Sequence, residues 1–415
     1  MDYQFPKNLH LDEVRAAIAA HNERLGTKAF IEADRGNHVI FNYLVAFADS
    51  FPHPSTGDIE LDRQYAILRE CRGLTFCKET GRVANRKFAK FFNINEKPET
   101  QVSVIDWSRP HVIFEKLDGS MITPIHLGSL DDIAPETLRW CTKMGMTDVA
   151  KPVEEWVAQH PNYAQWAAQT IRSGFTVIFE WCSRQQRIVI DYPRDRLVLT
   201  AIRDNATGEY LSHAEMLKAE NHGIEVVRAL DGSIENIEQF MSETRDLEGA
   251  EGYVIRFDDG HMLKVKGAWY CQIHKTKELL NFEKDVFSLI LSDHVDDAKA
   301  FMSEEDRDRI DRFSDALFHE VDNTVSRIAA LADIGKKFAG EDRKKYATEF
   351  VPNQAVSDLE KKLLFNAYSG HDIRTAVLNT IGSYTASGPR IEVIRHLING
   401  LNWNDYRDHS YCADD

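Results

Sequence analysis

The hydrophobic pattern of this chain changes once, near residue 275, and that change limits the folds available to it. Before that point, runs of β-branched and aromatic residues separated by turn residues predict strands. The predicted strands occupy residues 38–47, 72–77, 112–118, 121–127, 175–182, 187–192, 196–202, 251–257 and 262–266. Helical spacing interrupts them over 11–21 and about 151–171. Because helices do not alternate regularly with strands, we predict an α+β fold with antiparallel sheets.

After residue 275 the strand signal stops and helical spacing replaces it. Ser303 and Asp306 resemble a capping box, and apolar residues then follow on one helical face up to a predicted stop at Gly335. Further helices are predicted over 355–368, 371–381 and 389–401. A chain of 415 residues has room for two domains. We therefore predict an α+β domain over 1–275 and an all-α domain over 276–415.

The net charge of −16 would normally count against a protein that binds nucleic acid through its phosphates. The charge is unevenly distributed, however. Residues 63–116 contain eleven bases and six acids, whereas residues 283–322 contain thirteen acids and five bases. An acidic chain can therefore still carry a basic groove. The sequence shows no apolar run long enough for a membrane span and no signal peptide, so we expect a soluble, cytoplasmic protein that makes no membrane contact.

The sequence Lys116-Leu117-Asp118-Gly119 follows a predicted strand and places a lysine at the strand end. A K-x-D-G match alone is weak, because a solvated surface lysine explains it equally well. Its context is more specific, since a carboxylate in an apolar strand, an E-G-Y-V-I sequence and a K-x-K sequence follow in order. These are Glu180, then 251–255, then Lys264 and Lys266. That order is the motif series of the covalent nucleotidyltransferases, which include ATP-dependent ligases and mRNA capping enzymes.

Within that superfamily the chain most closely resembles the RNA ligase 1 family of T-even phages. The resemblance is carried by ECRGLTF at 70–76, KFFNINE at 90–96, FEWCSRQQRIVI at 179–190, EGYVIRFDDGHMLKVKGAWY at 251–270 with a following His274, and EDRKKYA at 341–347. DNA ligases and capping enzymes have a β-rich domain after the K-x-K strand, whereas this chain becomes helical there. The resemblance implies an ATP-dependent RNA ligase that uses Mg²⁺ or Mn²⁺ and joins 5′-phosphate and 3′-hydroxyl ends.

The resemblance also implies the partners. The substrates would be single-stranded or nicked RNA ends, with a nicked tRNA as the preferred one, and the protein would act as a monomer in RNA repair. A phage-encoded protein would then work in the host cytoplasm. The helical domain would select the RNA, and it carries a basic cluster of Lys336, Lys337, Arg343, Lys344 and Lys345.

Lys116 is the predicted nucleophile, which must lose its proton although an ordinary lysine titrates near 10.4. Lys264 and Lys266 alternate around Val265 and so point to one face of a strand, where they would repel a proton on Lys116 and neutralise phosphate charge. By resemblance, the nucleotide would contact Tyr43, Arg72, Lys90, Phe92, Glu115, Gly119, Lys143, Glu180, Glu251, Gly252, Lys264 and Lys266.

Several of these assignments have structural alternatives. Phe92 could belong to the hydrophobic core, and Glu180 could form a salt bridge with a structural arginine. The metal would be held by Glu251, Asp296 and Asp297, although a charged helix surface explains the two aspartates equally well. Two other functions are open: a GTP-dependent mRNA capping guanylyltransferase, and an RNA-end binding protein without catalytic activity.

Overall fold

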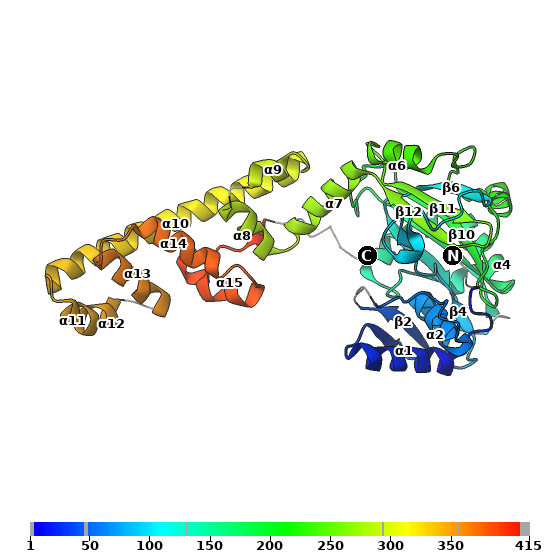
Figure 1. Ribbon diagram of the computed structural model, residues 1–415, viewed down its shortest axis with the longest axis horizontal. Coiled ribbons are helices and arrows are strands. Elements are labelled where there is room, and N and C mark those ends of the chain that lie inside the picture. Colours follow the sequence, from blue (N-terminus) through cyan, green and yellow to red (C-terminus); the bar gives the residue numbers. More distant parts are fainter. Residues whose placement is uncertain (1–3, 45–48, 130–131, 293, 355–356, 407–415) are drawn as a thin grey trace. The chain divides into compact units, whose positions relative to one another are not determined.

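A computed structural model describes residues 4–44, 49–129, 132–292, 294–354 and 357–406 of the chain. The chain divides into two compact units, Met1–Cys271 and Gln272–His409. Figure 1 shows strands and helices together in the first unit, and helices in the second. The predicted α+β class, with a helical C-terminal part, is confirmed.

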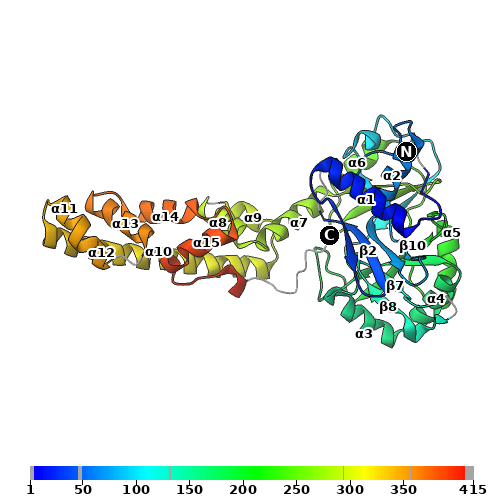
Figure 2. The ribbon, with the colours of Figure 1, turned by 90° about the horizontal axis from the view of Figure 1, so that it is seen from below.

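The described residues of the first unit form three four-stranded sheets. One has the order β1-β2-β3-β4, formed by β1 (Phe30–Asp34), β2 (His38–Tyr43), β3 (Arg72–Cys77) and β4 (Val83–Asn85). The helices α1 (Leu11–Leu25) and α2 (Ile59–Glu70) pack on it (Figures 1 and 2). Its core is aromatic, because Phe30, Phe41, Phe51 and Phe76 lie in one buried cluster.

The second sheet has the order β10-β9-β7-β8. Its strands are β7 (Ser120–Ile125), β8 (Arg139–Cys141), β9 (Phe175–Cys182) and β10 (Arg196–Asp204), and all its pairs are antiparallel. The helices α3 (Lys151–Gln159) and α4 (Pro161–Arg172) cover it with a core that includes Trp140, Trp166 and Phe179. The single helix predicted over 151–171 is thus two, because Pro161 cannot donate the hydrogen bond that would continue α3.

The third sheet has the order β5-β12-β11-β6. Its strands are β5 (Phe92–Asn93), β6 (His111–Lys116), β11 (Gly252–Phe257) and β12 (Met262–Lys266). The pairs β6–β11 and β11–β12 are antiparallel, whereas β12 and β5 run parallel. Between β10 and β11 in the chain lie α5 (His213–Met216) and α6 (Ile237–Arg245). Ile237, Phe240 and Met241 of α6 pack on the core of the third sheet.

A buried ion cluster joins the first sheet, with its helix α2, to the second sheet. Glu70 Oε1 lies 3.0 Å from Arg86 Nη2 and 2.7 Å from Arg203 Nη2, and both guanidinium groups are fully buried. Arg86 also donates to Pro6 O, and Arg203 donates to Gly208 O. The cluster therefore ties α2 to β10 and to the segment after β4.

The second unit is helical, with α10 (Glu304–Ala339) as its longest helix. Ser303 caps α10, because its hydroxyl accepts a hydrogen bond from the Asp306 amide, as predicted. α13 and α14 pack along α10 (Figures 1 and 2). The other helices in the described part of this unit, with α7 crossing the boundary, are α7 (Ala268–Leu280), α8 (Glu283–Leu291), α9 (Val295–Lys299), α11 (Arg343–Lys345), α12 (Val351–Gln354), α13 (Asp358–Tyr368), α14 (Ile373–Ser383) and α15 (Gly388–Ile394).

Two local predictions are wrong for identifiable reasons. The helix does not stop at Gly335 but continues to Ala339. The glycine is explained by packing and not by a helix end, because a Cβ at this position would lie 2.3 Å from the Tyr346 ring. Residues 187–192 do not form a strand. Their backbone instead bonds to a buried carboxylate of the candidate site.

Candidate active site

Three neighbouring strands bring Lys116, Gly252 and Lys266 into one row. Gly252 on β11 is paired with Lys116 on β6 and with Lys266 on β12. The carboxylate of Glu251, directly before Gly252, lies 2.7 Å from Lys116 Nζ and 2.9 Å from Lys266 Nζ. Glu251 is 3% exposed and the Lys116 side chain 21%. The strand register therefore places one buried carboxylate between two partly exposed lysines.

Gly252 is required by the close approach of β12. Its φ is +141°, and a Cβ at this position would lie 2.1 Å from the Val265 carbonyl oxygen. Any other residue would strain the backbone and push β11 away from β12. The missing side chain thus makes room for a neighbouring strand, which keeps Glu251 between its two lysines.

Lys264 lies at the centre of a group of cations. Burial, and after it the nearby charges of Lys116, Lys266, Lys90 and Arg72, together lower its pKa to about 7. Val265 between the two β12 lysines points into the hydrophobic core. The positive groups that the sequence predicts to converge therefore do lie together, on the face of the sheet opposite Val265.

Lys90 is surrounded by aromatic rings. Its Nζ lies 4.9 Å from the ring centre of Tyr43, 5.4 Å from that of Phe51 and 5.6 Å from that of Phe92. Lys143 Nζ lies 5.7 Å from the same Tyr43 ring. The structure thus brings Tyr43, Lys90 and Lys143 together, and Phe51 joins them although the sequence had not indicated it.

Phe92 is 2% exposed and packs with Phe51 in the core of the first sheet. A ring that stacks on a base needs an accessible face, so this burial favours the alternative in which Phe92 is a core residue. The strand pairing of Phe92 with Leu263 and of Asn93 with Lys264 fixes the segment that carries Lys90 beside β12.

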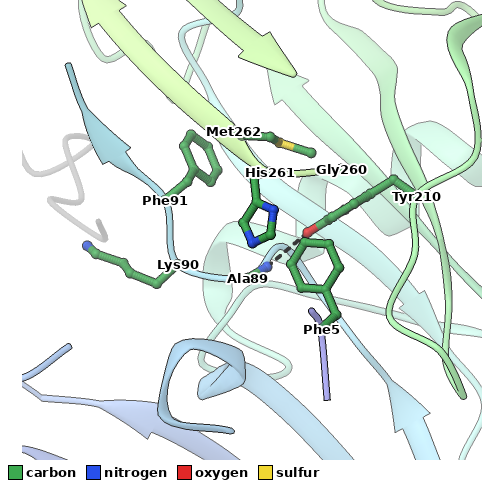
Figure 3. Close-up of a pocket in the computed structure, with 8 residues that line it drawn as sticks. All are labelled: Phe5, Ala89, Lys90, Phe91, Tyr210, Gly260, His261 and Met262. Carbon is green, nitrogen blue, oxygen red and sulfur yellow. Dashed lines mark hydrogen bonds between the residues drawn. The ribbon is translucent and has the colours of Figure 1, made fainter. Parts of the chain in front are cut away.

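Lys90 and Phe91 line a small cavity together with Phe5, Tyr210 and His261 (Figure 3). Tyr210 accepts a hydrogen bond from the Ala89 amide at 3.0 Å, and His261 stacks on Phe5 with their ring centres 4.8 Å apart. The cavity volume of about 10 Å³ is the space of one water molecule. These contacts support the backbone just before Lys90.

The turn after Lys116 is held by a buried carboxylate. Asp118 Oδ2 accepts hydrogen bonds from the amides of Val189 and Ile190, at 2.7 and 2.6 Å, and Oδ1 accepts one from the Tyr270 hydroxyl at 2.6 Å. The Asp118 amide donates to the Tyr192 hydroxyl. Burial raises the pKa of Asp118 above its ordinary value, against the opposing effect of these hydrogen bonds. The sequence did not indicate that Tyr192 and Tyr270 bind Asp118. The one signal in the sequence was Asp118 itself, an acid at the end of the apolar stretch 112–118.

The remaining predicted residues of this unit lie around the same strands. A Cβ on Gly119 would lie 2.3 Å from the Trp181 carbonyl oxygen, so the turn after Lys116 lies directly against β9. Glu180 on β9 is paired with Met121, and Arg72 donates to the Met121 sulfur at 3.2 Å. Glu115 is paired with Tyr253, next to the row of Lys116 and Gly252.

Asp296 and Asp297 belong to α9 in the helical unit. Asp296 lies 3.5 Å from Lys299, and Asp297 lies 3.5 Å from His294. Both carboxylates are exposed. In the part of the chain that the structure describes, no three His, Cys, Asp or Glu side chains gather into a set that could hold a metal. The same part contains no helix long and apolar enough to cross a membrane.

Several known proteins are similar to parts of this chain. A protein of Thermovibrio ammonificans named as a candidate RNA ligase is 29% identical over 329 residues, which cover 74% of this chain and 81% of that protein. RNA ligase 1 of bacteriophage TS2126 is 25% identical over 285 residues, 65% of each chain. Among solved structures, a mutant RNA ligase of Naegleria gruberi with ATP and Mn matches 40% of this chain and 52% of that one, at 19% identity and a TM-score of 0.32.

Residues 70–270 match a family model described as RNA ligase. The match includes Arg72, Lys90, Lys116, Glu251 and Lys266, and it ends at Tyr270. The resemblance to RNA ligases that the motifs indicate is therefore confirmed. Over residues 70–270 the chain therefore matches the RNA ligase family, and over longer stretches it is similar to proteins named as RNA ligases.

Proposed function

We propose that this protein joins RNA ends with ATP, through AMP attached to Lys116 and then through an RNA adenylate. In the first step Lys116 Nζ attacks the α-phosphorus, pyrophosphate leaves and the amine loses a proton. An oxygen of the RNA 5′-phosphate then attacks that phosphorus, the P–N bond breaks and the lysine regains a proton. Finally the RNA 3′-hydroxyl attacks the 5′-phosphorus and AMP leaves. The observation that supports this best is Lys116 beside Glu251 within a group of cations.

The surroundings of Lys116 suit this chemistry. Lys264, Lys266, Arg72 and Lys90 would neutralise the charge that develops on the phosphates during transfer. We assign Tyr43, Glu115, Gly119, Lys143 and Glu180 to the same nucleotide site, as their positions around the three strands allow. Phe92 would not contact the nucleotide but would support Lys90 as part of the hydrophobic core.

The site also suits a divalent ion that arrives with the nucleotide. Mg²⁺ is usually held by one or two carboxylates together with phosphate oxygens, and Glu251 provides a carboxylate at the lysine row. When bound, the ion would neutralise phosphate charge. We keep Asp296 and Asp297 of the helical unit as further proposed ligands.

The simplest test is incubation of the full chain with ATP and Mg²⁺, followed by intact mass measurement. We expect a gain of one AMP. A parallel incubation with GTP tests the capping guanylyltransferase, which would gain GMP instead. An RNA-end binding protein without activity would gain neither, so either of these two results contradicts the proposal.

ATP binding should be accompanied by proton uptake that depends on Lys264. In the protein without bound nucleotide the pKa of Lys264 is about 7, so at pH 8 most of this side chain is neutral. Phosphates nearby favour the ammonium form, so binding should raise this pKa and take up close to one proton at pH 8, but little at pH 6, where Lys264 is already charged. Calorimetry of a non-hydrolysable ATP analogue, in buffers of different ionisation enthalpy, measures the uptake.

The matched variants for that measurement are Lys264→Gln and Lys266→Gln, because both remove one β12 lysine from the same face. Uptake at pH 8 should disappear in the first and remain in the second. Equal uptake in wild type and Lys264→Gln would show that another group takes up the proton.

The helical unit is proposed to select the RNA, with a nicked tRNA as the preferred substrate and a monomer as the acting form. Lys336, Lys337, Arg343 and Lys344 are exposed, and within the described residues none of them forms an ion pair. Lys345 Nζ lies 4.4 Å from the Phe338 ring centre, and Phe338 is itself exposed. Unpaired cations beside an exposed ring are suited to RNA phosphates and bases.

Changing both Lys344 and Lys345 to Glu should therefore lower repair of a nicked tRNA about tenfold or more, while joining of a short single-stranded RNA changes little. The charge-matched control is Lys284→Glu with Lys362→Glu, which alters the same unit outside the cluster. Repair rates for both substrates, measured at several salt concentrations, test this prediction. An equal loss for the two substrates would contradict a recognition role for the cluster.

A further inference from the structure

The first unit has a second pocket that contains none of the residues assigned to ATP. It has a volume of about 550 Å³, within the range of ligand sites. The end of α1, the segment around Phe51, and the 3₁₀ turn Pro98–Thr100 form its walls. Its lining includes Arg24, Phe51, Tyr65, Lys97 and Glu99.

One wall of this pocket is a guanidinium group that lies over an aromatic ring. The Arg24 guanidinium lies 4.8 Å from the ring centre of Tyr65 and donates a hydrogen bond to the Tyr65 hydroxyl. Pro52 and Pro98 add apolar surface to the lining. RNA bases stack on guanidinium planes, and Arg24 is exposed, whereas the Tyr65 ring beneath it is 9% exposed. The Arg24 face of this wall therefore has the chemistry of a base-binding surface.

The charge of the pocket favours a phosphate. Glu99 lies in the lining, but its carboxylate is 2.5 Å from Arg69, whose side chain is 1% exposed. Burial raises the pKa of Glu99, but the hydrogen bond and charge of Arg69, a backbone hydrogen bond and the charge of His53 together hold it below its ordinary value. The Glu99 and Arg69 charges therefore cancel. The remaining charged groups in the lining are Arg24 and Lys97 against Asp49. Positive charge is therefore in excess.

The pocket is separated from the candidate ATP site by single aromatic side chains. Phe51 lines the pocket, and its ring centre lies 5.4 Å from Lys90 Nζ. Lys97 lines the pocket as well, and its Nζ lies 5.4 Å from the ring centre of Phe92, which also contacts Lys90. A strand that reaches the lysine row could place its neighbouring nucleotide in this pocket.

We propose that this pocket binds one nucleotide of the RNA strand being joined, with its base against the Arg24–Tyr65 wall and its phosphate at Lys97. The proposal rests on the proposed RNA-joining function. A nucleotide in the pocket could also be free ATP or AMP, which has the same chemistry, and the experiment below distinguishes the two sources.

The test uses the full chain with Lys97→Gln, and with Lys28→Gln as the matched control. Lys28 is an exposed lysine near the end of α1 that does not line the pocket. Fluorescence anisotropy with a labelled 5′-phosphorylated single-stranded RNA measures binding. We expect Lys97→Gln to weaken RNA binding about five- to tenfold and to reduce the salt dependence by about one phosphate contact, while Lys28→Gln binds like wild type. AMP attachment should be the same in all three proteins.

Unchanged RNA binding in Lys97→Gln would overturn the proposal. So would a loss of AMP attachment together with normal RNA binding, because the pocket would then serve the free nucleotide. Arg24→Gln provides a second variant that removes the stacking plane without touching Lys97, and it should weaken binding by a similar factor. If wild-type protein never gains AMP, the proposed function fails, whereas the RNA-binding comparison still decides whether the pocket holds RNA.

Discussion

Replacing Lys116 with alanine should abolish AMP attachment while the protein stays folded. The reaction proceeds through a bond between Lys116 Nζ and phosphorus, so no other group can replace the missing amine. The fold should survive because Glu251 keeps its contact with Lys266 Nζ at 2.9 Å. Intact mass after incubation with ATP and Mg²⁺, with a thermal melt of the same sample, measures both outcomes.

Two controls make the Lys116 result specific. Lys28→Ala removes an exposed lysine from the same unit and should gain AMP as wild type does. The wild-type adduct should be lost in acid and kept in base, as a phosphoramide is. AMP retained on Lys116→Ala would exclude Lys116 as the nucleophile, whatever the family of the protein.

Replacing Glu70 with alanine should cause the largest loss of stability. Glu70 accepts hydrogen bonds from Arg86 and Arg203, and both guanidinium groups are completely buried. Without the carboxylate, two buried positive charges would lose the negative charge that both of them contact. Breaking a buried ion pair in this way costs about 3–5 kcal/mol of the free energy of unfolding.

Urea unfolding followed by tryptophan fluorescence reports this loss, because six of the seven tryptophans lie before residue 272. The control is Glu209→Ala, since Glu209 is 65% exposed and lies 3.9 Å from Lys7. That substitution should change the free energy of unfolding by less than about 0.5 kcal/mol. If Glu70→Ala behaved like Glu209→Ala, the buried cluster would not be what joins α2 to β10.

Strands buried by their own pattern could be predicted from the sequence. Residues 175–182 and 262–266 are continuous or alternating apolar runs, and β9 and β12 have these bounds. Residues 187–192 have a similar pattern but form no strand, because the amides of Val189 and Ile190 donate to Asp118 instead of to a neighbouring strand. Apolar spacing alone does not reveal where a backbone amide finds its acceptor.

For the candidate site, the residue types could be predicted from the sequence but their arrangement could not. The chemistry of Lys116, Glu251, Lys264 and Lys266 was visible in the motifs, since these residue types in this order suit phosphoryl transfer. Their arrangement was not, because the row of Lys116, Gly252 and Lys266 depends on how β11 pairs with β6 and β12. Phe92 illustrates the limit, since the same residue could contact a base or fill the core, and its 2% exposure favours the core.

The α+β class, the change to helices near residue 275, and the lysines and carboxylates of the candidate site follow from side-chain period and from local motifs, so they could be predicted from the amino-acid order. The buried contact of Glu70 with Arg86 and Arg203, and the pocket beside Phe51, could not be predicted in this way. Such features join residues far apart in the chain. Their energies come from burial and charge pairing, which exist only once the chain has folded around them.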